Sequence, residues 1–127
     1  MNETELQEDL RGNSIAILIN RDYRPDMDDL ELFEITRGIW TKKMVTAAED
    51  RKYAFAFHKN VVKDVYEISH WVPAGTHQYF TRDLCRRRLE TNRWEFIGKK
   101  APDEIRLKYI DKKVTRDRSY GDPFVKM

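Results

Sequence analysis

The chain has 127 residues, of which 36% are charged and 40% apolar, and its formal net charge is +2. This length suits one domain with a single core, and the 12% of aromatic residues makes general disorder a poor description. No apolar run approaches the roughly 20 residues that a membrane helix needs, and the acidic start at residues 1–9 is unlike a secretory signal. The single cysteine, Cys85, cannot form an internal disulfide, so we expect a protein of the reducing cytoplasm.

Charge is unevenly distributed along the chain. Residues 1–50 hold 6 basic and 12 acidic residues, a balance of −6, whereas residues 82–118 hold 13 basic and 7 acidic residues, a balance of +6. A basic half interleaved with aromatic residues is typical of a surface that binds a polyanion such as nucleic acid. The alternative is two solvated faces that differ in sign.

The first predicted elements are a strand and a capped helix. We expect residues 1–12 to form a flexible lead-in and the apolar run at 14–20 to form a buried strand. Asp28 and Glu31 have the spacing of a capping box that starts a helix. Gly38 is a natural helix stop, which places Trp40 just beyond the end. The following residues, 42–52, are predicted to be a polar connection.

The middle of the chain predicts a β-hairpin followed by a long loop. Residues 53–57 alternate large and small side chains, as in a strand packed mainly on one face, and residues 61–68 form the returning strand. Residues 70–82 are predicted to be a loop, and loops of this length in small domains often carry function. Later elements are expected as follows: a basic helix at 83–90, a strand at 93–98, a helix at 102–109, and extended segments at 111–114 and 123–127.

Together these elements predict an α+β fold in one domain that spans residues 1–127, with 115–127 as a weakly assigned tail. Two or three short helices are too few to cover both faces of a parallel sheet. The pattern therefore favours a curved mixed sheet or a small β-barrel.

Several motifs carry a family resemblance over residues 14–114. They are Tyr23-Arg24-Pro25, Thr36-Arg37-Gly38, Tyr53-Ala54-Phe55-Ala56, Val65-Tyr66-Glu67-Ile68, Pro73-Ala74-Gly75-Thr76 and Arg93-Trp94-Glu95-Phe96. Taken together, they resemble a family of small bacterial domains that occur alone or attached to nuclease domains of the GIY-YIG type. The strand and helix order is also similar to the PUA-like superfamily, which includes the ASCH, EVE and YTH domains. This resemblance implies a curved β-barrel that recognises RNA or a modified base. It implies no nuclease activity, because the chain has no GIY-YIG motif.

Metal binding and catalysis are poorly supported by the residue spacing. His58, His70, His77 and Cys85 do not match a recognised zinc spacing. Nucleophilic catalysis by Cys85 would need a base and an oxyanion site, and a small packed side chain is the alternative. We therefore predict no metal, no cofactor and no catalytic residue.

The best candidate for a binding site is an aromatic and basic constellation. Trp71 and Trp94 have flat faces on which a base can stack, although tryptophans also anchor small cores. We favour Trp71 as functional because it is expected to open the loop. Further ligand-binding candidates are Asn20, Arg24, Gly75, Thr76, Tyr79 and Arg82. Phosphate contacts are expected from Arg86, Arg87, Arg88 and Arg93.

The sequence thus predicts a non-enzymatic module that binds nucleic acid or a modified base through an aromatic, arginine-flanked pocket. One alternative is a protein-interaction or regulatory subunit that works beside a nuclease or a defence enzyme. Another is an enzyme that acts on a nucleotide through the same pocket.

Overall fold

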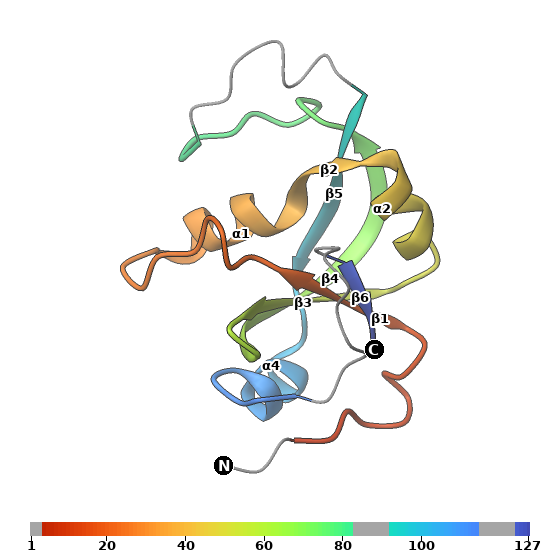
Figure 1. Cartoon of the computed structure of the whole chain (residues 1–127), viewed down its shortest axis with the longest axis vertical. Helices are drawn as coiled ribbons and strands as arrows, with labels where there is room; N and C mark the ends of the chain where they lie inside the picture. Colours follow the sequence, from red (N-terminus) through yellow and green to blue (C-terminus); the bar gives the residue numbers. More distant parts are fainter. Residues whose placement is uncertain (1–3, 83–91, 115–123) are drawn as a thin grey trace.

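A curved sheet with short helices packed around it forms the framework of the chain (Figure 1). The computed structural model describes residues 4–82, 92–114 and 124–127. Within these residues, six strands are hydrogen-bonded in the order β2-β5-β4-β3-β1-β6, and three helices accompany them. In chain order the elements are β1 (Ser14–Leu18), α1 (Asp29–Arg37), β2 (Gly38–Thr41), α2 (Lys42–Ala48), β3 (Tyr53–His58), β4 (Val61–Pro73), β5 (Arg93–Lys100), α4 (Asp103–Tyr109) and β6 (Phe124–Lys126). The predicted α+β class, with a curved mixed sheet and short helices, is confirmed.

The sheet is mixed because one strand pair is parallel. β1 pairs with β3 in parallel, and the other described pairs are antiparallel. A parallel pair needs a crossover connection, which α1, β2 and α2 supply here. The predicted hairpin is confirmed as β3 and β4, but β4 runs on to Pro73. Residues 70–73, expected in a loop, instead pair with β5, which offers a partner along its length.

Helix α1 begins and ends where the sequence predicts. The Asp28 carboxylate accepts a hydrogen bond from the Glu31 main-chain N–H at 2.8 Å, and the Glu31 side chain accepts from the Asp28 N–H at 3.4 Å. The capping box is therefore confirmed. Beyond Gly38, Trp40 lies in β2, and its indole N–H donates to the Thr36 carbonyl at 2.9 Å.

The prediction of a polar connection at residues 42–52 is wrong for Lys42–Ala48, which form α2. The Thr41 side chain caps this helix by accepting a hydrogen bond from the main-chain N–H of Met44. Only Val45 and Ala48 are buried in α2. Two buried positions in seven residues leave too short a buried face to mark this helix in the sequence.

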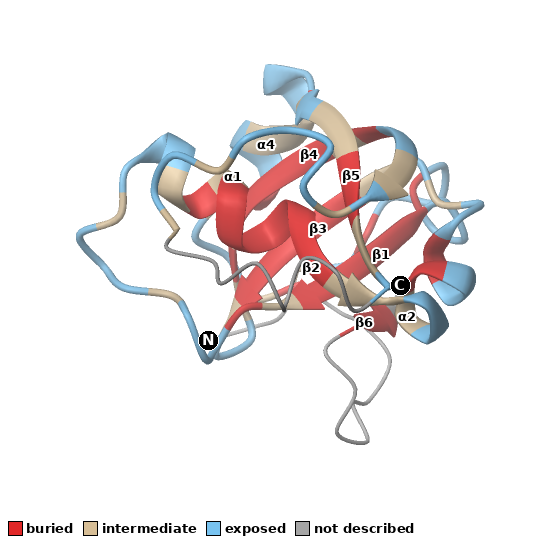
Figure 2. Ribbon diagram, turned by 90° about the horizontal axis from the view of Figure 1, so that it is seen from above, coloured by how far each residue is buried: buried red, intermediate tan, exposed pale blue. Residues whose placement is uncertain are grey.

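Both faces of the central strands are buried, so the sheet lies between two apolar layers (Figure 2). Along β3, the two alanines join a cluster that includes Leu32 and Ile35 of α1. Phe55 and Phe57 belong to a second cluster that includes Tyr109 of α4. The expectation that β3 packs mainly on one face is therefore wrong. Its alternation of small and large side chains separates two buried layers rather than a buried face from an exposed one.

The chain ends contribute to the second layer. Leu6 and Leu10, from the lead-in that we expected to be flexible, are buried in the same cluster as Tyr109. The main-chain N–H of Gln7 donates to the Tyr109 hydroxyl at 2.9 Å. At the other end, β6 pairs antiparallel with β1. The helix expected at 83–90 lies outside the described residues. In the described ranges, no helix is long and apolar enough to cross a membrane.

Candidate functional site

A buried carboxylate on β5 holds the chain that follows β4. Glu95 has no exposed surface, and its Oε2 accepts a hydrogen bond from Nη1 of Arg37 on α1 at 2.7 Å. Its Oε1 accepts the main-chain N–H of Gly75 at 2.7 Å, and its Oε2 accepts that of His77 at 3.2 Å. Residues 74–82, which we call the capping segment, are therefore tied to α1 and β5 through one side chain.

A second buried carboxylate holds the far end of the capping segment. Glu34 of α1 is 1% exposed, and it accepts the main-chain N–H groups of Phe80 at 2.9 Å and Thr81 at 2.8 Å. It also accepts the Thr81 hydroxyl at 2.6 Å. Burial by itself raises the pKa of Glu34, but these hydrogen bonds and the charge of Arg37 bring the pKa below its ordinary value. Glu34 is therefore ionised at neutral pH, and its charge is satisfied from within the protein.

Two arginines pack against Tyr79 in the middle of the capping segment. The Arg37 guanidinium lies 4.0 Å from the centre of the Tyr79 ring, and it also donates to the Gln78 carbonyl at 3.2 Å. Arg82 lies 5.7 Å from the same ring and donates to the carbonyl of Gly38 at 2.5 Å, just past the end of α1. Burial raises the pKa of Tyr79 well above its usual value, although the charge of Arg37 works in the opposite direction. Tyr79 thus joins the capping segment to α1 through cation–π contacts.

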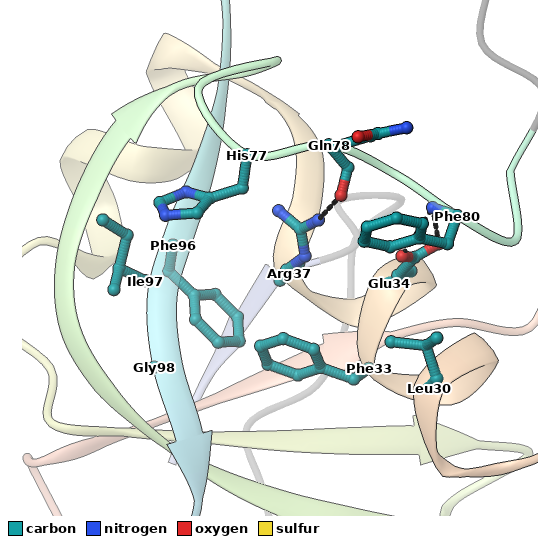
Figure 3. A pocket seen from close by; sticks show the side chains of 10 residues that line it. All are labelled: Leu30, Phe33, Glu34, Arg37, His77, Gln78, Phe80, Phe96, Ile97 and Gly98. Atoms are coloured by element: carbon teal, nitrogen blue, oxygen red, sulfur yellow. Dashed lines mark hydrogen bonds between the residues drawn. The ribbon is translucent and has the colours of Figure 1, made fainter.

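A cleft of about 270 Å³ lies between α1, β5 and the capping segment (Figure 3). Its floor contains the rings of Phe33 and Phe96, which meet edge to face with their centres 5.9 Å apart. At the rim, the residues Phe80 and Leu30 are exposed, at 71% and 46%. The complete lining is Leu30, Phe33, Glu34, Arg37, His77, Gln78, Phe80, Phe96, Ile97 and Gly98. Apolar and aromatic side chains therefore make up most of the wall.

The charged groups beside the cleft are already paired inside the protein. Glu34 is bound by the capping segment, and Arg37 is bound by Glu95. His77 offers a polar edge, because its side chain is 54% exposed and its Nδ1 lies 3.5 Å from Glu95. Figure 3 shows His77 among the side chains that line the cleft. A ligand in the cleft would meet aromatic rings and an imidazole edge, and this lining suits an uncharged flat group.

Half of the predicted ligand-binding residues come together in the capping segment; they are Gly75, Thr76, Tyr79 and Arg82. Their polar groups, however, are directed at the protein. The Gly75 N–H donates to Glu95, and the Thr76 hydroxyl donates to the Pro73 carbonyl at 2.5 Å. These residues shape the capping segment, while their neighbours line the cleft.

The two predicted stacking tryptophans lie in strands. Trp71 is part of β4, and its ring centre is 5.4 Å from that of Phe96 and 5.9 Å from that of Phe124. Trp94 is part of β5. Both rings are half-buried, and neither belongs to the lining of the cleft. The prediction that Trp71 opens a loop is wrong, because β4 extends past it to Pro73.

The other predicted contacts lie apart from the cleft or outside the described residues. Asn20 accepts the main-chain N–H of Lys59 at 2.8 Å, which holds the turn between β3 and β4. Arg24 pairs with Glu31 at 2.8 Å beside the start of α1, and Arg93 begins β5. Outside the described residues are Arg86, Arg87, Arg88 and Cys85. Among the described residues, no group of three or more His, Cys, Asp or Glu side chains is placed to hold a metal ion.

Sequence reasoning missed the residues that build the cleft. Glu95 carries a weak signal, because a charged residue between Trp94 and Phe96 in a strand is unusual at a buried position. Phe80 carries none, since its role depends on Glu34, which is 46 positions earlier in the chain. Local patterns do not encode contacts of that range.

Comparisons of the chain with protein-family models, with curated proteins and with solved structures found no match. The resemblance to the family of small bacterial domains therefore remains an expectation. The function has to be inferred from the geometry of the cleft.

Proposed function

We propose that the protein is a non-enzymatic nucleic-acid or modified-base binding module, and that the cleft beneath the capping segment takes the base. The observation that carries this proposal is the exposed ring of Phe80 above a cleft floored by Phe33 and Phe96. Phe80 is 71% exposed, so its side chain contributes little to the packing of the protein itself. Its ring can nevertheless stack on a flat ligand. Stacking is tolerant of base identity because every base has a π-face.

The electrostatics of the cleft support an uncharged ligand group inside it and phosphates outside it. Among the described residues that line the cleft, Glu34 is bound by main-chain N–H groups and Arg37 by Glu95, so the lining itself favours an uncharged group. Lys99, which is exposed, lies at the end of β5 that borders the cleft at Gly98. It belongs to the basic half of the sequence, whose balance of +6 suits a phosphate backbone.

The hydrogen bonding of Glu34 and Glu95 supports a binding role over a catalytic one. Each carboxylate accepts hydrogen bonds from two main-chain N–H groups of the capping segment. For Glu34 these hydrogen bonds favour the charged form and lower the pKa, so this carboxylate is a weak base. Its evident task is to fix the capping segment over the cleft.

A protein-interaction or regulatory subunit, acting beside a nuclease or a defence enzyme, is the second candidate. It is favoured by the exposure of Leu30 together with Phe80 at the rim, since exposed apolar side chains that lie together often mark a protein contact. Binding of nucleic acid that depends on Phe80 separates the first candidate from the second.

The test compares Phe80→Ala with Leu107→Ala by fluorescence anisotropy of a labelled single-stranded oligonucleotide. Leu107 is 78% exposed on α4, outside the cleft lining, so it is a matched control for the loss of an exposed apolar side chain. Loss of a stacked base costs about 1–3 kcal/mol, so Phe80→Ala should weaken binding by about 5- to 150-fold. In Phe80→Ala the main-chain N–H of residue 80 still donates to Glu34. The free energy of unfolding of this variant should therefore change by less than about 0.5 kcal/mol.

A salt series on the wild-type protein completes this test. Affinity should fall steeply as salt rises, because phosphate contacts release counterions. Wild-type protein that binds no oligonucleotide at low salt would contradict the proposal. If Phe80→Ala and Leu107→Ala weaken binding equally, the proposal that the base binds in the cleft is wrong.

A further inference from the structure

A second cleft adjoins the first along β5. It has a volume of about 220 Å³ and shares Leu30, Phe33 and Gly98 with the first cleft. Its remaining lining residues are Asp29, Tyr66, Lys99 and Lys100. Gly98 has no side chain between the clefts. A Cβ added there would collide with the Glu67 carbonyl and touch the Phe96 ring. The two clefts therefore adjoin at residues of α1 and β5.

The second cleft is lined by a residue with one of the six buried side-chain polar atoms that have no hydrogen-bond partner among the described residues. Tyr66 is fully buried, and its ring lies 5.1 Å from that of Phe33. Among the residues that the structure describes, its hydroxyl has no hydrogen-bond partner. Native proteins rarely leave a buried hydroxyl unpaired, because its desolvation is then uncompensated. An unpaired hydroxyl at the wall of a cleft is consistent with a partner supplied by a ligand.

The surroundings of Tyr66 make its hydroxyl a hydrogen-bond donor. Burial, followed by the charges of Asp64 and Asp29, raises the pKa of Tyr66 far above its usual value. The hydroxyl therefore keeps its proton at any physiological pH. Across the same cleft, the Asp29 carboxylate is an acceptor whose present partner is the Lys100 ammonium.

An ion pair at the surface lines the same cleft as Tyr66. The ion pair of Lys100 and Asp29 lies at the surface, with side chains that are 37% and 74% exposed. Exposed ion pairs contribute little to stability, so a ligand can displace this one at low cost. A group that enters here meets a donor and a carboxylate acceptor together, and a hydroxyl can satisfy both. Lys99 and Lys100 line the same cleft, where they can contact the phosphates that flank such a hydroxyl.

We propose that the second cleft holds the ribose of the nucleotide whose base occupies the first cleft. In this arrangement, which rests on the proposed function, Tyr66 donates a hydrogen bond to the 2′-hydroxyl, and the 2′-hydroxyl donates to the Asp29 carboxylate. A 2′-hydroxyl is both donor and acceptor, and it distinguishes RNA from DNA. The protein is therefore selective for single-stranded RNA, and Tyr66 is its specificity-determining residue.

The experiment compares RNA and DNA oligonucleotides of one sequence, built from A, C and G so that the sugar is the sole difference. Wild-type protein and Tyr66→Phe are titrated against both probes by fluorescence anisotropy at low salt, and the melting temperatures of both proteins are measured. The substitution keeps the buried ring and removes the unpaired hydroxyl, so the variant should melt no lower than the wild type. The wild type should bind RNA more tightly than DNA. In the variant, RNA affinity should fall about two- to tenfold, with DNA affinity unchanged.

Each other result has a separate meaning. Equal affinity of the wild type for RNA and DNA overturns the sugar assignment and leaves the base-binding function in place. An RNA preference that survives in Tyr66→Phe overturns the role of the Tyr66 hydroxyl. Wild-type protein that binds neither probe overturns the proposed function, and the sugar assignment with it.

Discussion

The substitution Glu95→Gln should destabilise the protein strongly, because Glu95 is the only carboxylate that Arg37 pairs with among the described ion pairs. The side chains of Arg37 and Glu95 are 6% and 0% exposed, and their contact is 2.7 Å. Glutamine keeps the shape of the side chain but removes its charge, which leaves a buried guanidinium without its direct ion-pair partner. Breaking a buried pair in this way costs about 3–5 kcal/mol.

The expected loss can be measured as a shift in melting temperature. For a chain of 127 residues, 3–5 kcal/mol corresponds to a decrease of roughly 10–20 °C. Glu67→Gln is the matched control, since Glu67 lies on the neighbouring strand and pairs with Lys52 at 3.8 Å near the surface. This control should lower the melting temperature by only a few degrees, about what a surface ion pair contributes.

A double substitution tests whether the charge pair is the cause. Arg37→Gln combined with Glu95→Gln removes both buried charges, so the double variant should be more stable than the sum of the two single losses predicts. If Glu95→Gln melts within about 3 °C of the wild type, the pair does not hold the capping segment in the way described, and the reasoning is refuted.

The remaining predictions concern Glu34 and Trp71. The pKa of Glu34 is lowered in the folded protein from 4.5, so its stabilising effect is complete above that pH and is lost as the pH falls through the folded pKa. In urea titrations, the wild-type free energy of unfolding should therefore fall more steeply below about pH 4.5 than that of Glu34→Gln, and parallel curves would contradict the assignment. Trp71→Ala should cost about 2–4 kcal/mol of stability, because the half-buried ring packs against Phe96 and Phe124. Its affinity for oligonucleotides should change less than that of Phe80→Ala, and the opposite order would restore Trp71 as a ligand-stacking residue.

Local sequence patterns determined the elements of the fold. The capping box at Asp28 and Glu31 and the stop at Gly38 define α1 because each depends on residues within one or two turns of helix. The hairpin of β3 and β4 follows from two apolar runs separated by a short turn. The α+β class follows from the order of these elements, since too few helices are present to cover a parallel sheet on both sides.

Tertiary structure decided the extent of β4 and with it the position of the candidate site. The sequence from His70 to Pro73 has no clear strand pattern of its own, and it becomes a strand because β5 lies beside it. Trp71 therefore lies in the sheet, where its ring packs against Phe96 and Phe124. A strand that is stabilised by pairing with a distant partner cannot be distinguished from a loop by its own residues.

The cleft itself depends on contacts between residues that are far apart in the chain. The pair of Arg37 and Glu95 spans 58 positions, and the hydrogen bond from Phe80 to Glu34 spans 46. A local pattern records whether a residue is apolar or charged, but not which distant group will satisfy a buried charge. The sequence alone thus determined that a basic, aromatic half exists. Only the folded chain, by bringing two carboxylates under one segment, determined where the candidate cleft lies.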